Sequence, residues 1–470
     1  MEYSADSTRE IAKLQFSDQK RREQDWMAYA PINQGALACL ARESRREDWD
    51  MTSSIGRAAT ALADCAWLDA ERARAYTRIL LALTLIGAIG WIALSPGGLD
   101  REGKPIGTDF IGFYTASRLA LEGRAALAYD VGSHWAAQKA LFGPKLGYTA
   151  FFYPPPALLV SLPLALAPYF WSLAGWLAMT GYAFYRVLRL YLPSLDLVTF
   201  LAFPAVFVNA AHGQNGFLSA ALIGGGLFAM DRSPALAGVL LGAMAFKPHL
   251  ALVIPFALIF ARRWTILIAA AATATAFSAA SLAAFGAPAW DSFFADGRFA
   301  RAALENNLVG DEKMQSVFAA VRLLHGSLGL AWGAQIATAL CVVAALWRLE
   351  RRAFRAPAEA AAIVCSGLLA SPFLLDYDLT LLAIPLVWLL REGLRTGFIP
   401  FEKALMALAF GLPLVSRLVA GALGLPLAPL TIAAIFALTM RRALPGAPES
   451  ARRANPGAYS NMPLSSALEQ

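Results

Sequence analysis

Charged residues are scarce in this sequence. Asp, Glu, Lys and Arg make up only 16% of its 470 residues, whereas 58% are hydrophobic. Soluble domains carry about a quarter charged residues, so the composition excludes an ordinary soluble protein. Cysteine and histidine are also rare, with four of each, and the cysteines follow neither a disulfide framework nor a metal-binding spacing. We therefore expect no metal site and no cofactor.

Motifs of several common enzyme classes are missing. The sequence has no glycine-rich loop ending in Gly-Lys-Ser or Gly-Lys-Thr, no zinc-ligand spacing and no Gly-x-Ser-x-Gly elbow. These absences argue against nucleoside-triphosphate hydrolysis, zinc catalysis and serine hydrolysis.

The formal net charge of +7 does not indicate a nucleic-acid partner. Residues 1–76 contain 11 basic and 13 acidic residues, so the positive excess lies in the apolar part of the chain. There the arginines gather at the ends of apolar segments, as at Arg262, Arg263, Arg441 and Arg442. This pattern is typical of the cytoplasmic loops of membrane proteins. We expect contact with membrane lipid and none with nucleic acid.

Long apolar segments are what the sequence has in abundance. They recur from Thr77 to Met440, separated by Gly, Pro or short charged clusters. A helix needs about 20 mostly apolar residues to cross a bilayer, and only helices or closed barrels satisfy the backbone in lipid. The alternating pattern of barrel strands is absent. The sequence therefore predicts an all-α polytopic membrane protein with about 12 transmembrane helices, in which Pro156–Leu190 is one bent crossing or a proline-broken hairpin.

The arginine clusters also predict the orientation of the chain. With Pro156–Leu190 as one crossing, they all face the cytoplasm, together with both termini. Residues 1–76 then form a cytoplasmic N-terminal extension, and residues 77–442 form the transmembrane domain with a long first extracytoplasmic loop at 96–155. Residues 443–470, rich in Pro, Ser and Ala, are expected to be disordered. The unusual polar residues collect on the outer face.

Asp109 is the first of these polar residues and follows the first apolar segment. Apolar and aromatic residues come after it at helical spacing, Tyr114 among them, and predict an amphipathic helix on the membrane surface. Asp109 could cap this helix, because aspartate is a preferred N-cap residue, or it could act as a catalytic base. The residues alone leave both interpretations open.

A proline-rich stretch, FFYPPPALL, precedes the second span. Aromatic residues favour the membrane interface, and proline is tolerated in a first helical turn. Tyr153 and Pro154 therefore either mark a helix start at the interface or form a rigid wall beside a sugar or a lipid headgroup.

Lys247 lies between two apolar segments, in FKPHLALVIPF. A charge within a membrane is costly and indicates a functional site. Here it predicts a phosphate-binding lysine, with His249 beside it, at a turn between two short helices that face an aqueous cavity. The alternative is a lysine that extends its ammonium group to the interface.

The stretch HGQNG places His212, Gln214 and Asn215 between two apolar segments. It predicts either a plain glycine turn or hydrogen-bond donors to a sugar.

The stretch SPFLLDYD carries Asp376, Tyr377 and Asp378 at the start of a later span. Two acids there either mark a helix start, where negative charge suits the helix dipole, or belong to a site.

The order of these motifs resembles glycosyltransferase family 87. TDFIGFYTASRLALEGRAALAYD, YPPPALLVSLPLALAP, HGQNGFLSAALI, AGVLLGAMAFKPHLALVIPFALIFARRW and SPFLLDYDL follow one another within residues 77–440, and both tails remain outside the resemblance. The family is also described as a domain of unknown function related to polyprenyl-phosphate-mannose-dependent mannosyltransferases. The resemblance implies a GT-C type bundle of membrane helices with an acidic residue in its first extracytoplasmic loop.

The resemblance also implies a reaction. Asp109 matches the proposed catalytic base of the family, and Gly213–Gln214 and Lys247–Pro248 match its Gly-Gln and Lys-Pro motifs. The implied enzyme moves a hexose, with mannose as first candidate, from a polyprenyl-phosphate donor to a glycan or glycolipid acceptor outside the bacterial plasma membrane, with inversion. The last motif departs from the histidine-rich form of the mannosyltransferase branch, because it has two aspartates around Tyr377. The expected substrate-binding residues are Tyr114, Tyr153, Pro154, His212, Gln214, Asn215, Lys247, His249, Asp376, Tyr377 and Asp378.

Two other classes of function fit parts of the pattern. A transporter would also place polar residues at broken helices, although the halves of this chain show no repeat and the polar residues gather towards one face. A non-catalytic member of the family would bind polyprenyl lipid or support envelope assembly without turnover.

Overall fold

The computed structural model divides the chain into two units, Met1–Leu62 and Ala63–Gln470. It describes residue 61 and residues 63–101, 103–350 and 356–443. Most of the predicted N-terminal extension, and the predicted C-terminal tail from residue 444 onward, lie outside the described residues.

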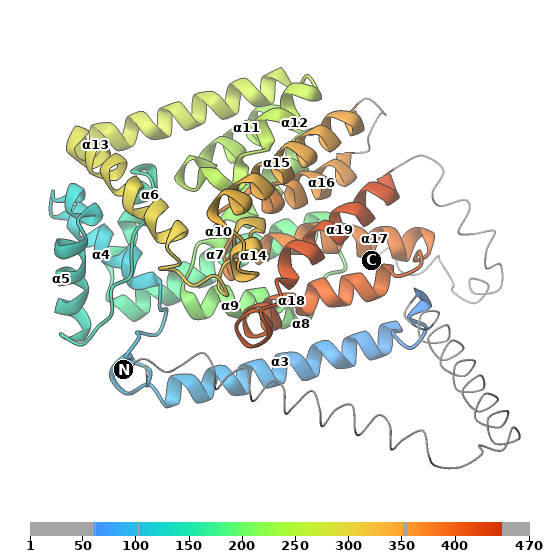
Figure 1. Cartoon of the computed structure of the whole chain (residues 1–470), viewed down its shortest axis with the longest axis horizontal. Coiled ribbons are helices and arrows are strands. Elements are labelled where there is room, and N and C mark those ends of the chain that lie inside the picture. The colour runs from blue at the N-terminus through green and yellow to red at the C-terminus, as the bar shows by residue number, and fades with distance from the viewer. Residues whose placement is uncertain (1–60, 62, 102, 351–355, 444–470) are drawn as a thin grey trace, which may run out of the picture. The chain divides into compact units, whose positions relative to one another are not determined.

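The described part of the second unit is built of helices and contains no β-strand (Figure 1). Short 3-10 segments, labelled η, join or interrupt the α-helices. In chain order the elements are α3 (Ala70–Ala93), η1 (Pro96–Gly98), α4 (Phe110–Leu121), η2 (Ala125–Tyr129), α5 (Val131–Phe142), α6 (Pro156–Ser161), η3 (Leu162–Leu166), α7 (Tyr169–Tyr191), α8 (Leu197–Ala202), α9 (Pro204–His212), α10 (Gly216–Ala229), α11 (Pro234–Gly242), η4 (Ala243–Phe246), η5 (Pro248–Ala251), α12 (Ile254–Phe260), α13 (Trp264–Glu305), α14 (Val317–Leu323), α15 (Leu328–Glu350), α16 (Ala356–Ala370), η6 (Asp376–Leu382), α17 (Ala383–Thr396), α18 (Glu402–Leu423) and α19 (Leu427–Ala443). The predicted all-α class is therefore confirmed.

Four of the described helices are long and apolar enough to cross a membrane. They are α3, α13, the Leu328–Leu349 part of α15, and α18. Other apolar helical segments have only 10–17 residues. A membrane crossing needs about 20 residues, so these segments are too short for one. The predicted count of about 12 transmembrane helices is therefore not confirmed, because Gly, Pro and 3-10 turns divide the apolar runs.

Proline divides the long segment Pro156–Leu190. The 3-10 segment η3 ends at Leu166, and α7 begins at Tyr169 directly after Pro168, whose φ of −57° and ψ of 148° are not helical. Proline lacks the N–H that a helix interior requires and clashes with the preceding turn. The predicted break in this segment is therefore present in the structure.

The first loop, residues 96–155, folds onto the helical body. Helix α4 forms where it was predicted, but all except two of its 12 residues are buried, so it is a core helix and does not lie on the membrane surface. His134 of α5 holds it: the imidazole Nε2 lies 2.7 Å from Thr115 Oγ1 and 3.1 Å from the carbonyl oxygen of Gly112. Burial lowers the pKa of His134 to about 4, so this contact is made by a neutral ring at pH 7.

Helix α13 has 42 residues and changes direction near its middle. Its backbone turns at Gly286, where φ is 73°, and then continues as a helix to Glu305. The helix packs along α11 (Figure 1). It also contacts η4 and η2 of the first loop. Its last turns, around Phe299, are thereby brought to the wall of the cavity described below.

Two glycines let the HGQNG turn approach its neighbours closely. Gly213 ends α9 in the left-handed region, with φ of +66°, and a Cβ atom there would lie 2.5 Å from Cβ of Phe110. Gly216 begins α10, and a Cβ atom there would lie 2.7 Å from the carbonyl oxygen of Tyr377. Only glycine, which has no Cβ atom, permits both approaches. They bring the turn between the start of α4 and η6.

Replacing Gly216 by alanine is therefore expected to destabilise the protein. The added methyl group must push α10 away from η6, and overpacking of this kind costs about 1–3 kcal/mol. The measurement is the melting temperature of the purified protein in detergent. Gly175→Ala is the matched control, because a Cβ atom at Gly175 of α7 meets nothing within 4 Å. Equal melting temperatures for the two variants would contradict the close approach.

Candidate functional site

Asp109 lies at the N-cap position of α4, but its side chain does not cap the helix. Its backbone N–H donates to the carbonyl oxygen of His212 over 3.0 Å. Its carboxylate Oδ2 instead accepts a hydrogen bond of 3.0 Å from Nε2 of Gln214. The side chain is half-buried and lines a cavity. The capping interpretation of Asp109 therefore does not describe this side chain.

Gln214 is held so that its amide nitrogen points to Asp109. Its Oε1 accepts from the hydroxyl of Tyr153 over 3.2 Å and from the backbone N–H of Asn215 over 3.2 Å. Its backbone carbonyl accepts from Trp176 Nε1 and from Asn209 Nδ2. Because Oε1 already faces two donors, Nε2 is the group left to donate to the carboxylate. HGQNG is therefore more than a plain turn, since it orients the acid.

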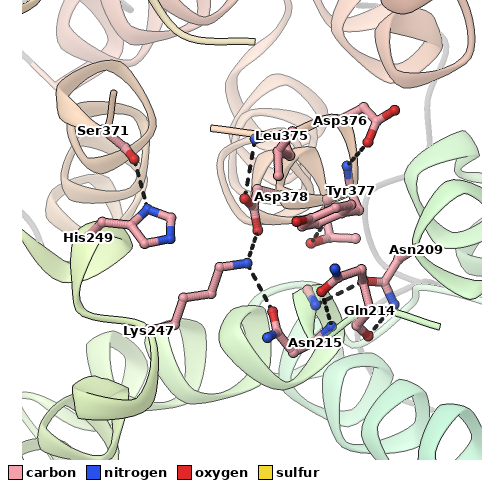
Figure 2. A network of polar contacts seen from close by, with 12 residues as sticks. Asn209, Gln214, Asn215, Lys247, His249, Ser371, Leu375, Asp376, Tyr377 and Asp378 are labelled. Carbon is pink, nitrogen blue, oxygen red and sulfur yellow. Dashed lines mark hydrogen bonds and ion pairs between the residues drawn. The ribbon is translucent and has the colours of Figure 1, made fainter. Parts of the chain in front are cut away.

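Lys247 and Asp378 form a buried ion pair (Figure 2). The ammonium Nζ lies 2.6 Å from Oδ1 of Asp378 and donates over 2.9 Å to Oδ1 of Asn215. Only 2% of the Lys247 side chain and 1% of the Asp378 side chain are exposed. Lys247 has φ of −144° and ψ of 66° between η4 and η5, so the predicted turn between two short helices is present. The extended interfacial lysine of the alternative interpretation is not what the structure shows.

Aromatic rings and a second acid surround this pair. The Lys247 ammonium lies 5.0 Å from the ring centroid of Tyr377 and 5.8 Å from that of Tyr153. Asp376 is buried, and its Oδ1 accepts from the backbone N–H of Tyr377 over 2.8 Å. Burial raises the pKa of Asp376, while the charges of His212 and Arg417 oppose that rise.

The remaining predicted residues divide between the cavity wall and the core. His249 lines the cavity, and its Nδ1 lies 2.9 Å from Oγ of Ser371 (Figure 2). Pro154 also lies on the wall. Tyr114 does not, because its buried side chain donates from the hydroxyl to the carbonyl oxygen of Ala167 over 3.0 Å. Asn215 is likewise absent from the wall and acts behind it, by holding Lys247.

The cavity has a volume of about 1070 Å³. Asp109, Tyr153, Gln214, Lys247 and the 376–378 segment share its wall with the last turns of α13. The structure thus brings together in one place most of the polar residues that the sequence singled out. Among the described residues, no group of three or more His, Cys, Asp or Glu side chains could hold a metal ion.

Four basic residues on the wall carry no prediction from the sequence: Arg101 and Lys104, which are exposed, and Arg417 and Lys313, which are half-buried. Arg417 belongs to α18 and Lys313 to the loop before α14, and both line the cavity. An arginine inside an apolar run marks a functional site by default, so KALMALAFGLPLVSRLVAGAL contained a signal for Arg417. Lys313 lies in a polar loop and carries no such signal.

Removing the ammonium group alone should destabilise the protein strongly. Lys247→Met leaves the Asp378 carboxylate buried without a counter-charge, which costs about 3–5 kcal/mol of unfolding free energy. Lys247→Met combined with Asp378→Asn should recover part of that loss, because no net charge remains buried. The measurement is denaturant unfolding in detergent. Arg124→Met is the control: its pair with Glu122 is exposed, so a change below about 1 kcal/mol is expected. A double variant no more stable than Lys247→Met would contradict the role of the pair.

Part of the chain matches a known protein family. The model of glycosyltransferase family 87 matches residues 151–372. No curated protein and no solved structure matches the chain. The matched segment contains Tyr153, Gln214 and Lys247, whereas Asp109 precedes it and Asp378 follows it. The resemblance indicated by the order of the motifs is therefore confirmed for residues 151–372, which the model of glycosyltransferase family 87 matches.

Proposed function

We propose that this protein is an integral membrane glycosyltransferase that moves a hexose from a polyprenyl-phosphate donor to a glycan or glycolipid acceptor. We place the reaction at the outer face of the bacterial plasma membrane, with mannose as the first candidate sugar. The family match supports glycosyl transfer, and the apolar helices support a place in the membrane. The observation that carries the proposal further is the carboxylate of Asp109, which lines the cavity and has no ion pair with any described residue.

Asp109 has the chemistry of a general base. It forms no ion pair with any described residue and accepts a hydrogen bond from the neutral amide of Gln214. Its Oδ1 has no hydrogen bond from any residue in the described part of the chain, so it is the atom that can accept a proton. The amide fixes the plane of the carboxylate without consuming both oxygens.

The proposed reaction is a single displacement. An acceptor hydroxyl gives its proton to Oδ1 of Asp109 as its oxygen forms a bond to the anomeric carbon of the sugar. The bond from that carbon to the phosphate oxygen breaks, and its electron pair leaves with the lipid phosphate, so the configuration at the anomeric carbon inverts. General-base assistance of this kind contributes about 10²–10⁴-fold in rate.

Other residues of the cavity wall are suited to bind the phosphate, the sugar and the prenyl chain of the donor. Lys247 has three ammonium donors, of which two have partners among the described residues, and we assign the third to an oxygen of the departing phosphate. His212, His249 and Tyr153 offer polar groups to the sugar. The apolar residues Trp91 and Phe299, from α3 and α13, suit a prenyl chain that comes from the bilayer.

Asp109→Asn should lower turnover by about 100-fold or more, because the variant keeps the shape of the side chain and loses the proton acceptor. The measurement is sugar transfer from a synthetic polyprenyl-phosphate hexose by the purified protein, with a melting curve for each variant. Asp130→Asn is the matched control. Asp130 caps α5 by accepting from Ser133 N–H, and asparagine caps about as well. A fully active, folded Asp109→Asn protein would refute the assignment of the base.

The proposed orientation places residues 96–155 outside the cell. In a Cys341→Ser background, which removes the exposed cysteine among the described ones, Lys145→Cys should react with a membrane-impermeant maleimide in intact cells. Arg232→Cys, at an exposed position between α10 and α11, should react only after lysis. The reverse pattern of labelling would invert the topology.

A further inference from the structure

The charge balance of the cavity raises a question about the donor phosphate. Lys247 is paired with Asp378, both are buried, and the pair is neutral as a whole. A lipid phosphate that entered the cavity would bring its negative charge near the carboxylate of Asp109. Such a charge is stable in a partly buried site only if further cations face it.

Arg417 and Lys313 are suitable cations. Both line the cavity and both are half-buried. Within the described ranges neither side chain makes a hydrogen bond or an ion pair, which distinguishes them from Lys247. Arg417 also lies in α18, one of the candidate membrane spans, where an unpaired charge is costly unless it serves a site.

The fold brings these two residues to one part of the wall. The loop that carries Lys313 is joined to the segment before η6 by an isolated bridge between Met314 and Leu375 and by a 2.7 Å hydrogen bond from Gln315 N–H to the carbonyl oxygen of Leu374. This contact places Lys313 near Asp376, the next residue along that segment.

Arg417 reaches the same region from α18. Its charge acts on Asp376, as the opposing effect on the pKa of that acid indicates. Gly421 lies one turn further along the same face of α18, and a Cβ atom there would be 3.8 Å from Cβ of Glu312. The residue next to Lys313 thus packs against the face of α18 that carries Arg417.

We propose that Arg417 and Lys313 together bind the phosphate group of the lipid-linked donor. The inference rests on the proposed function and deepens it by naming two further residues, beside Lys247, that hold the leaving group. Arg417 offers a planar fork of N–H donors to two phosphate oxygens, and Lys313 offers a compact point charge. When the bond between the anomeric carbon and the phosphate oxygen breaks, the electron pair moves to the phosphate, and the two cations stabilise the added charge.

The test is direct binding to the full-length protein in detergent. The probe is radiolabelled farnesyl phosphate, with farnesol and inorganic phosphate as competitors. Arg417→Gln and Lys313→Gln should each raise the Kd for farnesyl phosphate by about tenfold to a hundredfold, as expected for a hydrogen bond to a charged group. Arg417→Lys should lie between the wild type and Arg417→Gln. Competition by farnesol should be the same in all proteins.

Arg301→Gln is the matched control, because Arg301 lies on α13 near the cavity but has a side chain 71% exposed and paired with Glu305. Unchanged affinity in both glutamine variants, or an equal loss of affinity for farnesol, would overturn the proposal. Competition by inorganic phosphate as strong as that by farnesyl phosphate would overturn the lipid source of the phosphate. The two proposals can also fail separately. If the wild-type protein transfers no sugar but Arg417→Gln still weakens the binding of farnesyl phosphate, the proposed function is refuted and the phosphate-binding site is retained.

Discussion

The geometry of the site depends on the buried contact between Lys247 and Asp378. The two residues are 131 positions apart and come from different turns. The same ammonium holds Asn215, whose backbone N–H donates to Gln214, which in turn donates to Asp109. One chain of hydrogen bonds therefore joins four segments of the sequence. Separating these segments would leave a charge unpaired in the interior, which would cost several kcal/mol of folding free energy.

The residues that form this chain of hydrogen bonds lie at breaks between helices. The elements that contribute polar groups end or begin at the site: α4 begins after Asp109, α10 begins after Asn215, and Lys247 separates η4 from η5. A continuous helix would have carried its backbone past the cavity and aimed its side chains at neighbouring helices. Interruptions by Gly and Pro leave the polar residues at turns, where their side chains converge. This arrangement also explains why only part of the apolar sequence forms helices long enough to cross a bilayer.

Much of this arrangement could be predicted from single residues, and the pairings could not. Burying a lysine within a membrane helix costs free energy, so a turn at the lysine between two apolar runs could be predicted from sequence. The break at the prolines in the segment before α7 could be predicted as well. The partner of Lys247 could not be predicted, because hydropathy says nothing about which distant acid will meet it. The periodicity after Asp109 correctly predicted α4, but an amphipathic pattern does not distinguish a lipid surface from a protein core, and α4 is buried. Arg417 could also have been predicted as a site residue, because an arginine inside an apolar run is costly in a membrane.

In the proposed mechanism a single carboxylate, that of Asp109, assists one direct displacement at the anomeric carbon. The most direct measurement is the anomeric configuration of the product, determined by NMR after transfer from a polyprenyl-phosphate sugar of known configuration. One displacement assisted by one base predicts a product with the opposite configuration to the donor. A product that retains the configuration of the donor would require a covalent intermediate or a second displacement, and it would contradict the single-displacement mechanism.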